Sequence, residues 1–187
     1  GAQAQLERAL ALSQTSQFRA GERQALTRLG VLKHEDLHDP VAALADFDRA
    51  RALQPDSPEI LINRAEAQLA AGQFDAYVRD LPDVMKALRG PDDRMALAAY
   101  AWTTALLTDS ADTKQRAQDF LKAYPAWPVA QPMSWTFGGI RQALTQRQRP
   151  GAPLDRVLAV LALLEQPRSP DTTAQLAALL APPSRAR

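Results

Sequence analysis

The 187-residue chain contains no cysteine. This absence excludes disulfide bonds, catalysis by a thiolate and metal sites built on cysteine, and it leaves the redox compartment undetermined. Histidine is nearly absent as well, with two residues in the whole chain. No apolar run reaches the ~18 residues that a membrane-spanning helix needs, so the sequence predicts no insertion into a membrane.

No sign of charge dominates the chain. Its 22 Lys and Arg residues face 21 Asp and Glu residues, which leaves a formal net charge of +1, and the two signs alternate along the sequence. No basic stripe and no acidic tail stands out. Because the binding of nucleic acid or of an anionic membrane surface relies on clustered basic residues, the sequence implies neither as a partner.

Glycine is scarce, with eight residues, whereas alanine, the best helix former, is abundant with 36. Apolar residues recur at intervals of three and four, and no segment of useful length alternates with period two. Prolines and glycines break this pattern at points such as Asp39-Pro40, Gly72 and Gly90-Pro91. The sequence therefore predicts an all-α protein whose helices span about residues 3–13, 17–37, 40–53, 58–71, 74–89, 92–108, 111–124, 135–148, 154–166 and 171–181.

A repeated pattern begins with the string AALADFDRARALQP, which contains Ala43, Phe47 and Ala50. It resembles the second helix of a tetratricopeptide repeat, where small residues let two helices approach and an aromatic ring fills the gap between them. Upstream, Leu29-Gly30 resembles the Leu-Gly pair of the first helix. The string LINRAEAQLAAGQF resembles the first helix and turn of a following repeat, which starts in register.

This resemblance implies a right-handed α-solenoid over residues 1–125, with its clearest repeats at about 23–57 and 58–91 and a degenerate repeat at 92–125. Residues 126–182 are expected to form a C-terminal helical cap, and residues 183–187 a disordered tail. One departure lies in the second repeat. Tyr77 replaces the usual small residue there, and Pro82 is expected to kink or split the helix over 74–89.

The sharpest catalytic motif is His34-Glu35-Asp36-Leu37-His38, which fits the H-E-x-x-H pattern. On one continuous helix, the two histidines would share a face and bind Zn²⁺, with Glu35 activating a metal-bound water. Asp39-Pro40 is a strong helix-start signal, however, so His38 is expected at or beyond the end of the first helix. A third ligand would have to be Glu59 or Glu66, and neither is expected to point toward this turn. The alternative is an exposed turn in which the histidines cap the helix carbonyls.

Other catalytic signals are weak. Acid pairs such as Asp92-Asp93 are typical of solvated faces and helix caps, the serines and threonines lack a partner base, and Gly138-Gly139 lacks the rest of a phosphate-binding loop. The sequence therefore predicts no enzyme, no cofactor and no resident metal.

Aromatic residues concentrate between prolines over residues 127–137, with Trp127, Trp135 and Phe137. Such a segment is either an exposed binding patch or a connection whose rings fill the end of the core. We favour the second interpretation, because aromatic side chains mainly contribute buried apolar area.

The tetratricopeptide resemblance also implies a binding surface, since the first helix of each repeat lines the concave face in that family. By register, the surface comprises Glu59, Ile62, Asn63, Glu66 and Leu69, then Asp93, Ala96, Leu97, Tyr100 and Thr103. Asn63 matches the asparagine that clamps a peptide carboxylate in some members, but Asp93 and Leu97 stand where the cationic partners would be needed. The predicted partner is therefore a basic or neutral extended protein segment.

Taken together, these patterns predict a non-catalytic module for protein–protein interaction. A zinc-dependent hydrolase around His34 and His38 is the first alternative, and a structural spacer in a longer repeat protein is the second. The opening string LERALALSQTS looks like the second helix of an incomplete repeat, which favours a longer array and weak self-association. Residues 1–5 resemble the region around a signal-peptide cleavage site or a remnant of a tag, so localisation stays open, with the bacterial periplasm favoured over the cytoplasm.

Overall fold

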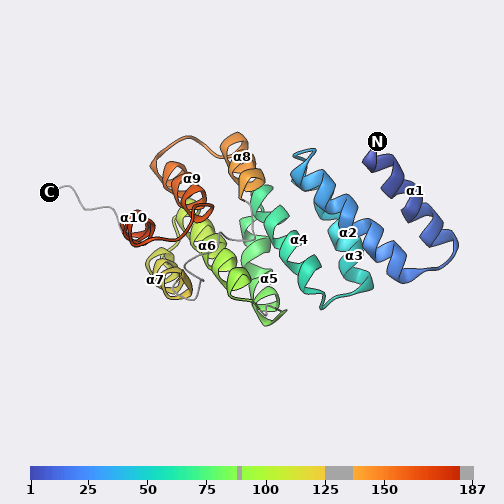
Figure 1. Ribbon diagram of the computed structural model, residues 1–187, viewed down its shortest axis with the longest axis horizontal. Coiled ribbons are helices and arrows are strands. Elements are labelled where there is room, and N and C mark those ends of the chain that lie inside the picture. The colour runs from blue at the N-terminus through green and yellow to red at the C-terminus, as the bar shows by residue number, and fades with distance from the viewer. Residues whose placement is uncertain (88–89, 125–136, 182–187) are drawn as a thin grey trace. The chain divides into compact units, whose positions relative to one another are not determined.

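A computed structural model describes residues 1–87, 90–124 and 137–181 of the chain. Over these residues the protein is entirely helical, which confirms the all-α prediction (Figure 1). The helices are α1 (Ala2–Thr15), α2 (Arg19–Glu35), α3 (Pro40–Leu53), α4 (Pro58–Ala70), α5 (Phe74–Ala87), α6 (Pro91–Leu107), α7 (Thr113–Ala123), α8 (Gly138–Arg147), α9 (Ala152–Leu164) and α10 (Pro170–Leu180). They form two compact units, Gly1–Ala87 and Leu88–Arg187, which are described separately below.

The helix boundaries follow the proline and glycine signals in the sequence. At the start of α3, the Asp39 carboxylate accepts a hydrogen bond from the Ala42 amide at 3.0 Å, and Pro40 opens the helix without an amide that needs a partner. Gly72 follows α4 with a φ of 73°, a left-handed conformation that glycine adopts without steric strain. Among the described helices, none combines the length and apolar character needed to cross a bilayer.

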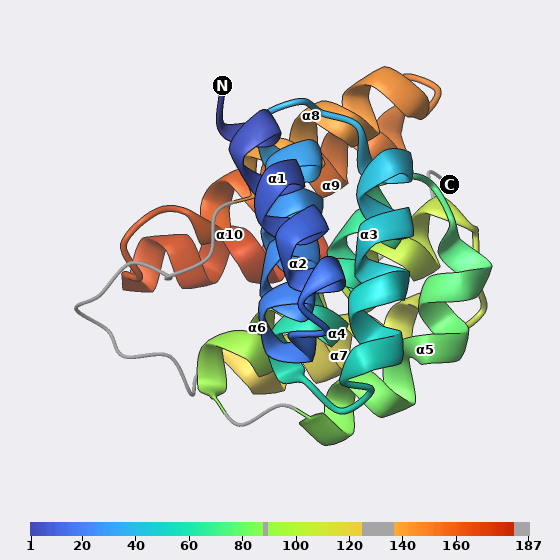
Figure 2. The same ribbon diagram turned by 90° about the vertical axis from the view of Figure 1, so that its right-hand side faces the viewer.

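In the first unit, successive helices pack on one another from α1 to α5, and α2 also packs directly on α4. In Figure 2, α3 and α5 lie on one side of α2 and α4. This is an arrangement of consecutive helical hairpins, consistent with an all-α repeat fold. Helix α1 packs on α2 but buries none of its own residues, and Leu12 is 71% exposed.

The core of the first unit is built from small residues around one aromatic ring. Phe47 is fully buried and packs with Ala43, Leu44 and Ala67. Gly30 of α2 is in close approach to the same ring. The sequence-based expectation that Phe47 fills a gap between closely packed helices is therefore observed.

The expected split at Pro82 is not observed, because α5 is one continuous helix from Phe74 to Ala87. Proline removes the amide that would bond the carbonyl four residues earlier, at Val78. Pro82 is exposed, and the Val78 side chain is 51% exposed. The lost hydrogen bond therefore falls on the solvent side of the helix, where water can bond the Val78 carbonyl. Tyr77, which replaces the usual small residue, is buried.

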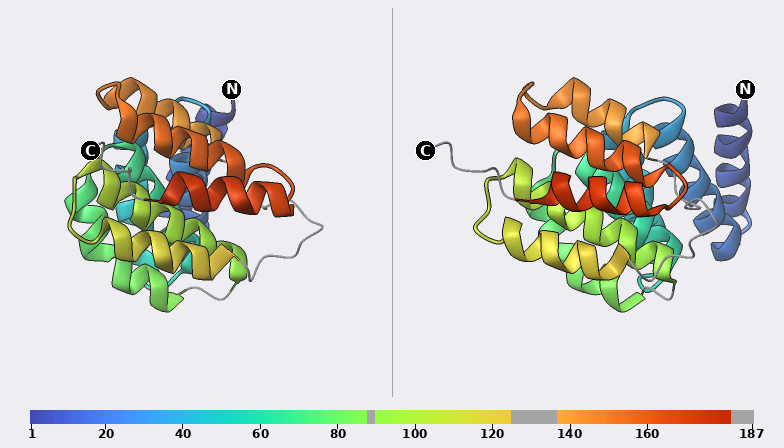
Figure 3. Two further views of the ribbon diagram at one scale, coloured as in Figure 1. Left: turned by 90° about the vertical axis from the view of Figure 1, so that its left-hand side faces the viewer. Right: turned by 60° about the vertical axis from the view of Figure 1, so that its left-hand side comes forward.

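In the second unit, α6 packs on α7 and α9, and α9 also packs on α8 and α10. Both views in Figure 3 show α10 between α9 and α7. Trp102 of α6 is fully buried, with its ring centroid 6.5 Å from that of Phe120. At the start of α8, Phe137 is fully buried in an edge-to-face contact with Tyr100, at 5.8 Å between centroids.

The predicted boundary at residue 125 and the predicted tail at 183–187 lie outside the described residues, as do Trp127 and Trp135 of the aromatic segment. Helices α6 and α7, predicted as a third repeat, belong to the same compact unit as α8, α9 and α10. Phe137 is the one aromatic residue of the segment that is described, and its burial agrees with a role in the core.

Candidate functional site

The H-E-x-x-H motif does not lie on one helix. Helix α2 ends at Glu35, Asp36 caps it, and His38 has a φ of 53°, which is outside the helical region. This confirms that His38 lies beyond the end of the first helix, which ends two residues earlier than the predicted residue 37. The His38 side chain is exposed, in the turn before α3.

His34 differs from the expectation of an exposed turn, because only 5% of its surface is accessible. Its Nε2 atom lies 3.9 Å from Oε1 of Glu66 on α4, and its Nδ1 atom has no hydrogen-bond partner within the described parts of the chain. At that distance the contact with Glu66 is electrostatic and longer than a hydrogen bond. The burial follows from position, since His34 stands one turn after Gly30 on the same face of α2, which packs on α3 and α4.

Glu66 is therefore directed toward the end of α2, contrary to the sequence-based expectation. Glu59, the other predicted ligand, is exposed in the first turn of α4, seven residues earlier and about 10 Å away along the helix. In the parts of the chain that the structure describes, no group of three or more His, Asp or Glu residues is arranged to hold a metal ion.

An acidic face runs along the neighbouring surfaces of α2 and α4, and we define it by Glu35, Glu59, Asn63 and Glu66. Partial burial raises the pKa of the Glu35 carboxyl above its ordinary value. The negative charges of Glu66 and Asp36 raise it further, while His34 opposes the shift. The pKa of Glu35 is therefore that of a partly buried carboxyl with two further acids nearby.

Two basic side chains of α2 and α4 pair with acids of α3 and α5. The Lys33 ammonium donates a hydrogen bond to Asp46 of α3 at 2.6 Å. Arg64 of α4 forms ion pairs with Asp48 of α3 and Asp80 of α5. These ion pairs therefore connect α2 and α4 to α3 and α5 and stabilise the packing of the helices.

The Arg64 network also includes a buried amide. Gln68 of α4 donates a hydrogen bond to Asp80 at 2.8 Å, and Arg51 of α3 lies 3.6 Å from Asp83. Burial alone would raise the pKa of Asp80, but the hydrogen bonds from Gln68 and Arg64 outweigh it and hold this pKa below its ordinary value. The network therefore favours the ionised form of Asp80 in the folded protein.

The structure contradicts part of the predicted binding surface. Tyr100 and Thr103 of α6 are fully buried, Tyr100 against Phe137, so neither is available on an open surface. Asp93 is half-buried. Its carboxylate accepts a hydrogen bond from the Gly90 amide at 3.3 Å, so Asp93 caps the start of α6. This surface was predicted from the register of the repeat alone, which takes no account of how α8 and α9 pack within the second unit.

In the first unit, Glu59 is exposed and Asn63 and Glu66 are half-buried. Ile62 and Leu69 are buried and contribute to the core instead. Sequence reasoning missed Glu35 as a member of the acidic face. The sequence did contain a sign of this proximity. Glu66 stands 32 residues after His34, and the two lie near the same position in the predicted first helices of successive repeats.

No protein-family model matches the chain, and no curated protein or solved structure gives a significant match. The resemblance to tetratricopeptide repeats therefore stays a prediction that depends on the residues named above.

Proposed function

We propose that the protein is a non-catalytic interaction module that binds a basic or neutral extended protein segment along the acidic face of α2 and α4. This proposal rests on the exposed carboxylates of Glu35 and Glu59, which lie at the two ends of the acidic face. The raised pKa of Glu35, caused first by partial burial and then by the negative charges of Glu66 and Asp36, shows that other acids lie near it. A lysine or arginine of a partner would form an exposed ion pair with either carboxylate.

The expected binding is modest and depends on salt. An exposed ion pair contributes about 0.2–1 kcal/mol, and its strength falls as ionic strength rises. Recognition through this face therefore needs more than one basic residue in the partner, spaced so that they meet Glu35 or Glu66 at one end and Glu59 at the other. Asn63 lies between the two ends on α4 and supplies an amide that can bond a partner's backbone.

The fold that we infer for this module is a right-handed solenoid, in which α2–α3 and α4–α5 are tetratricopeptide-like repeats, α6–α7 is a degenerate repeat and the helices that follow form a cap. The packing of α2 on both α3 and α4 supports this inference, because each first helix in such an array contacts its own partner and the first helix of the next repeat.

The zinc-dependent hydrolase is a weaker proposal, because His38 lies beyond the end of α2 while His34 is buried. A structural spacer is the remaining alternative, and it would have no preference among peptides.

The test uses the full chain and three peptides of equal length that carry lysine, glutamine or glutamate at alternate positions. We expect the lysine peptide to bind most tightly by isothermal titration calorimetry and to weaken as NaCl is raised. The double variant Glu35→Gln/Glu59→Gln should lose about three- to tenfold in affinity, corresponding to two exposed ion pairs.

The matched control is Glu7→Gln, which removes an exposed acid from α1 without changing the acidic face. Circular dichroism establishes that each variant is folded. Equal binding of the three peptides, or an equal effect of Glu7→Gln, would contradict the acidic face and favour the spacer.

A further inference from the structure

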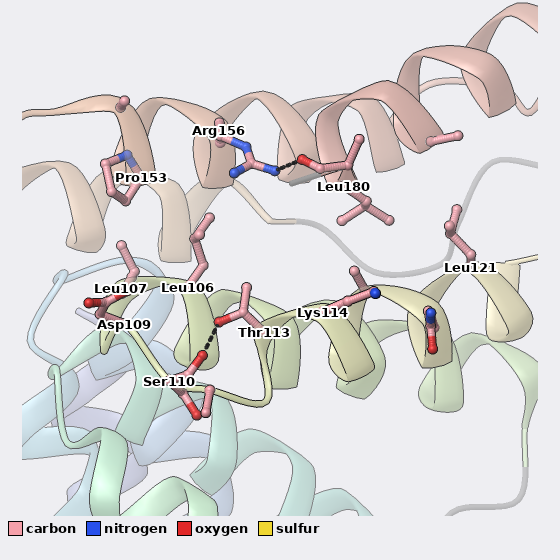
Figure 4. Close-up of a pocket in the computed structure, with 16 residues that line it drawn as sticks. Leu106, Leu107, Asp109, Ser110, Thr113, Lys114, Leu121, Pro153, Arg156 and Leu180 are labelled. Atoms are coloured by element: carbon pink, nitrogen blue, oxygen red, sulfur yellow. Dashed lines mark hydrogen bonds between the residues drawn. The ribbon is translucent and has the colours of Figure 1, made fainter. Parts of the chain in front are cut away.

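The second unit contains an open groove of about 790 Å³ that the proposed function does not use. One wall is formed by the end of α6 and by α7, and the opposite wall by α9 and α10 (Figure 4). The volume lies within the ~300–1,000 Å³ that is usual for small-molecule sites, which often form between the helices of a bundle. The groove is open because residues on both walls are small, among them Ala117 of α7 and Ala177 of α10.

The lining is mainly apolar. Leu106, Leu107 and Leu121 line one wall while remaining half-buried, so they present apolar surface to solvent inside the groove. Leu180 faces them from α10. Covering this surface would be favourable in proportion to the apolar area removed from water.

Two cations border this apolar surface. The Lys114 side chain of α7 is exposed and has no ion-pair or hydrogen-bond partner among the residues that the structure describes. Arg156 of α9 donates hydrogen bonds to the carbonyl oxygens of Leu179 and Ala181, each at 2.6 Å, and lies 5.9 Å from the centre of the Trp102 ring. These contacts fix the guanidinium in place without neutralising its charge.

Asp109 is the single carboxylate among the described lining residues, and it lies beside Leu107 at one end of the groove in Figure 4. Lys114 lies further along α7, between Asp109 and Leu121. The groove therefore combines an apolar lining with an excess of positive charge near its middle. This combination is complementary to a molecule with one negative charge and an apolar body.

We propose that this groove binds a free aliphatic monocarboxylate, with the carboxylate near Lys114 and the hydrocarbon chain along Leu121 and Leu180. Lys114 and Leu121 stand seven residues apart, about 10 Å along the axis of α7, which suits a chain of medium length. A small molecule fits the groove better than a partner helix, because few polar groups line it and its volume is that of a ligand site.

The direct test is isothermal titration calorimetry of the full chain with octanoate, decanoate and decyltrimethylammonium, each far below its micelle-forming concentration. We expect decanoate to bind about tenfold more tightly than octanoate, because each buried methylene contributes roughly a three- to fourfold gain in affinity. We expect decyltrimethylammonium to bind more weakly than decanoate, since it carries the same chain and the opposite charge. Equal affinity for the two decyl compounds would overturn the proposal.

Two pairs of variants locate the site. Ala177→Trp fills the groove and should abolish decanoate binding, whereas Ala178→Trp introduces the same ring at a neighbouring exposed residue of α10 that does not line the groove. Lys114→Glu should weaken decanoate binding about three- to tenfold, whereas Lys122→Glu, on an exposed residue of the same helix outside the lining, should not.

Ala177 and Lys114 are both exposed, so their replacement leaves the core intact. The variants Lys114→Glu and Lys122→Glu test the site even where a tryptophan disturbs α10. Equal effects within either pair of folded variants would overturn the proposal. Binding of an acidic amphipathic peptide in the absence of any decanoate binding would also overturn it, and would assign the groove to a partner helix.

Discussion

The ring of Phe47 on α3 occupies the space that a side chain at Gly30 on α2 would need. A Cβ atom built on Gly30 would lie 2.5 Å from Cε1 of Phe47, which is far inside van der Waals contact. Phe47 is fully buried among Ala43, Leu44 and Ala67, so the ring has no free space into which it could move. The close approach of α2 and α3 therefore depends on the absence of a side chain at residue 30.

Gly30→Ala should destabilise the first unit in spite of the higher helix propensity of alanine. Overpacking a filled core costs about 1–3 kcal/mol, and the propensity gain of about 1 kcal/mol offsets only part of it. The difference is a net loss of up to about 2 kcal/mol in the free energy of unfolding, measured by urea denaturation.

The control for this variant is Gly21→Ala on the same helix. A Cβ at Gly21 would lie 2.4 Å from the Phe18 ring and 2.6 Å from Oγ of Ser13, but the ring is 59% exposed and can turn away into solvent, and the Ser13 hydroxyl can rotate away. Gly21→Ala should therefore be neutral or stabilising. A loss of stability at residue 21 as large as that at residue 30 would contradict the argument from packing.

Much of this fold could be predicted from local signals. Asp39-Pro40 and Gly72 act through caps and backbone angles that depend on near neighbours in sequence, and the structure has helix boundaries at both. The packing of Phe47 could also be predicted, because a ring between small residues at helical spacing indicates closely packed helices. The effect of Pro82 could not be predicted from local signals, since it depended on which side of α5 faces solvent.

The candidate site was less predictable, because it depends on contacts between residues far apart in sequence. The contact of His34 with Glu66 arises from the packing of α2 on α4, and the motif at 34–38 gave no sign of it. Tyr100 was placed on a surface by register, but Phe137, 37 residues later, covers it in the structure. The groove beside Lys114 lies between the predicted pair α6–α7 and the helices α9 and α10, and no sequence pattern indicated how these two pairs pack on each other.

Glu35→Gln should stabilise the first unit at neutral pH. The pKa of Glu35 is raised in the folded state, first by partial burial and then by Glu66 and Asp36, so folding favours its protonated form. The native carboxyl therefore lowers stability as pH rises above its unfolded pKa and through its folded pKa. Because the side chain is largely solvated, we expect a gain of only a few tenths of a kcal/mol at pH 7. Thermal denaturation at pH 7 and pH 3.5 measures it, and a gain that persists at pH 3.5 would contradict this origin.

Asp80→Asn should destabilise the first unit most strongly near neutral pH. The hydrogen bonds from Gln68 and Arg64 lower the pKa of Asp80 against the effect of burial, so its contribution is present above its unfolded pKa and is lost as pH falls through the lower folded value. Removing the charge leaves a partly buried Arg64 with one fewer partner, and we expect a loss of about 1–3 kcal/mol.

Asp83→Asn is the control, since Asp83 is 58% exposed, and it should change stability by less than about 0.5 kcal/mol. Equal losses in the two variants would show that the network around Arg64 contributes little.

Glu165→Ala should loosen the start of α8 while leaving the first unit unchanged. One carboxylate oxygen of Glu165 accepts a hydrogen bond from the Phe137 amide at 2.7 Å, and the other accepts one from Arg141 at 2.7 Å, so this residue at the end of α9 holds the first turn of α8. Its loss leaves the Phe137 amide, next to a fully buried ring, without an acceptor, at a cost of about 1–3 kcal/mol.

Hydrogen exchange resolves the effect by region, because local opening is measured amide by amide. We expect faster exchange in α8 and unchanged exchange in α2 to α4. Glu165→Gln keeps an oxygen acceptor for Phe137 and loses the charge that pairs with Arg141, so its effect should be smaller. Equal acceleration in both units after Glu165→Ala would show that the two units unfold as one, and would contradict the local role assigned to this carboxylate.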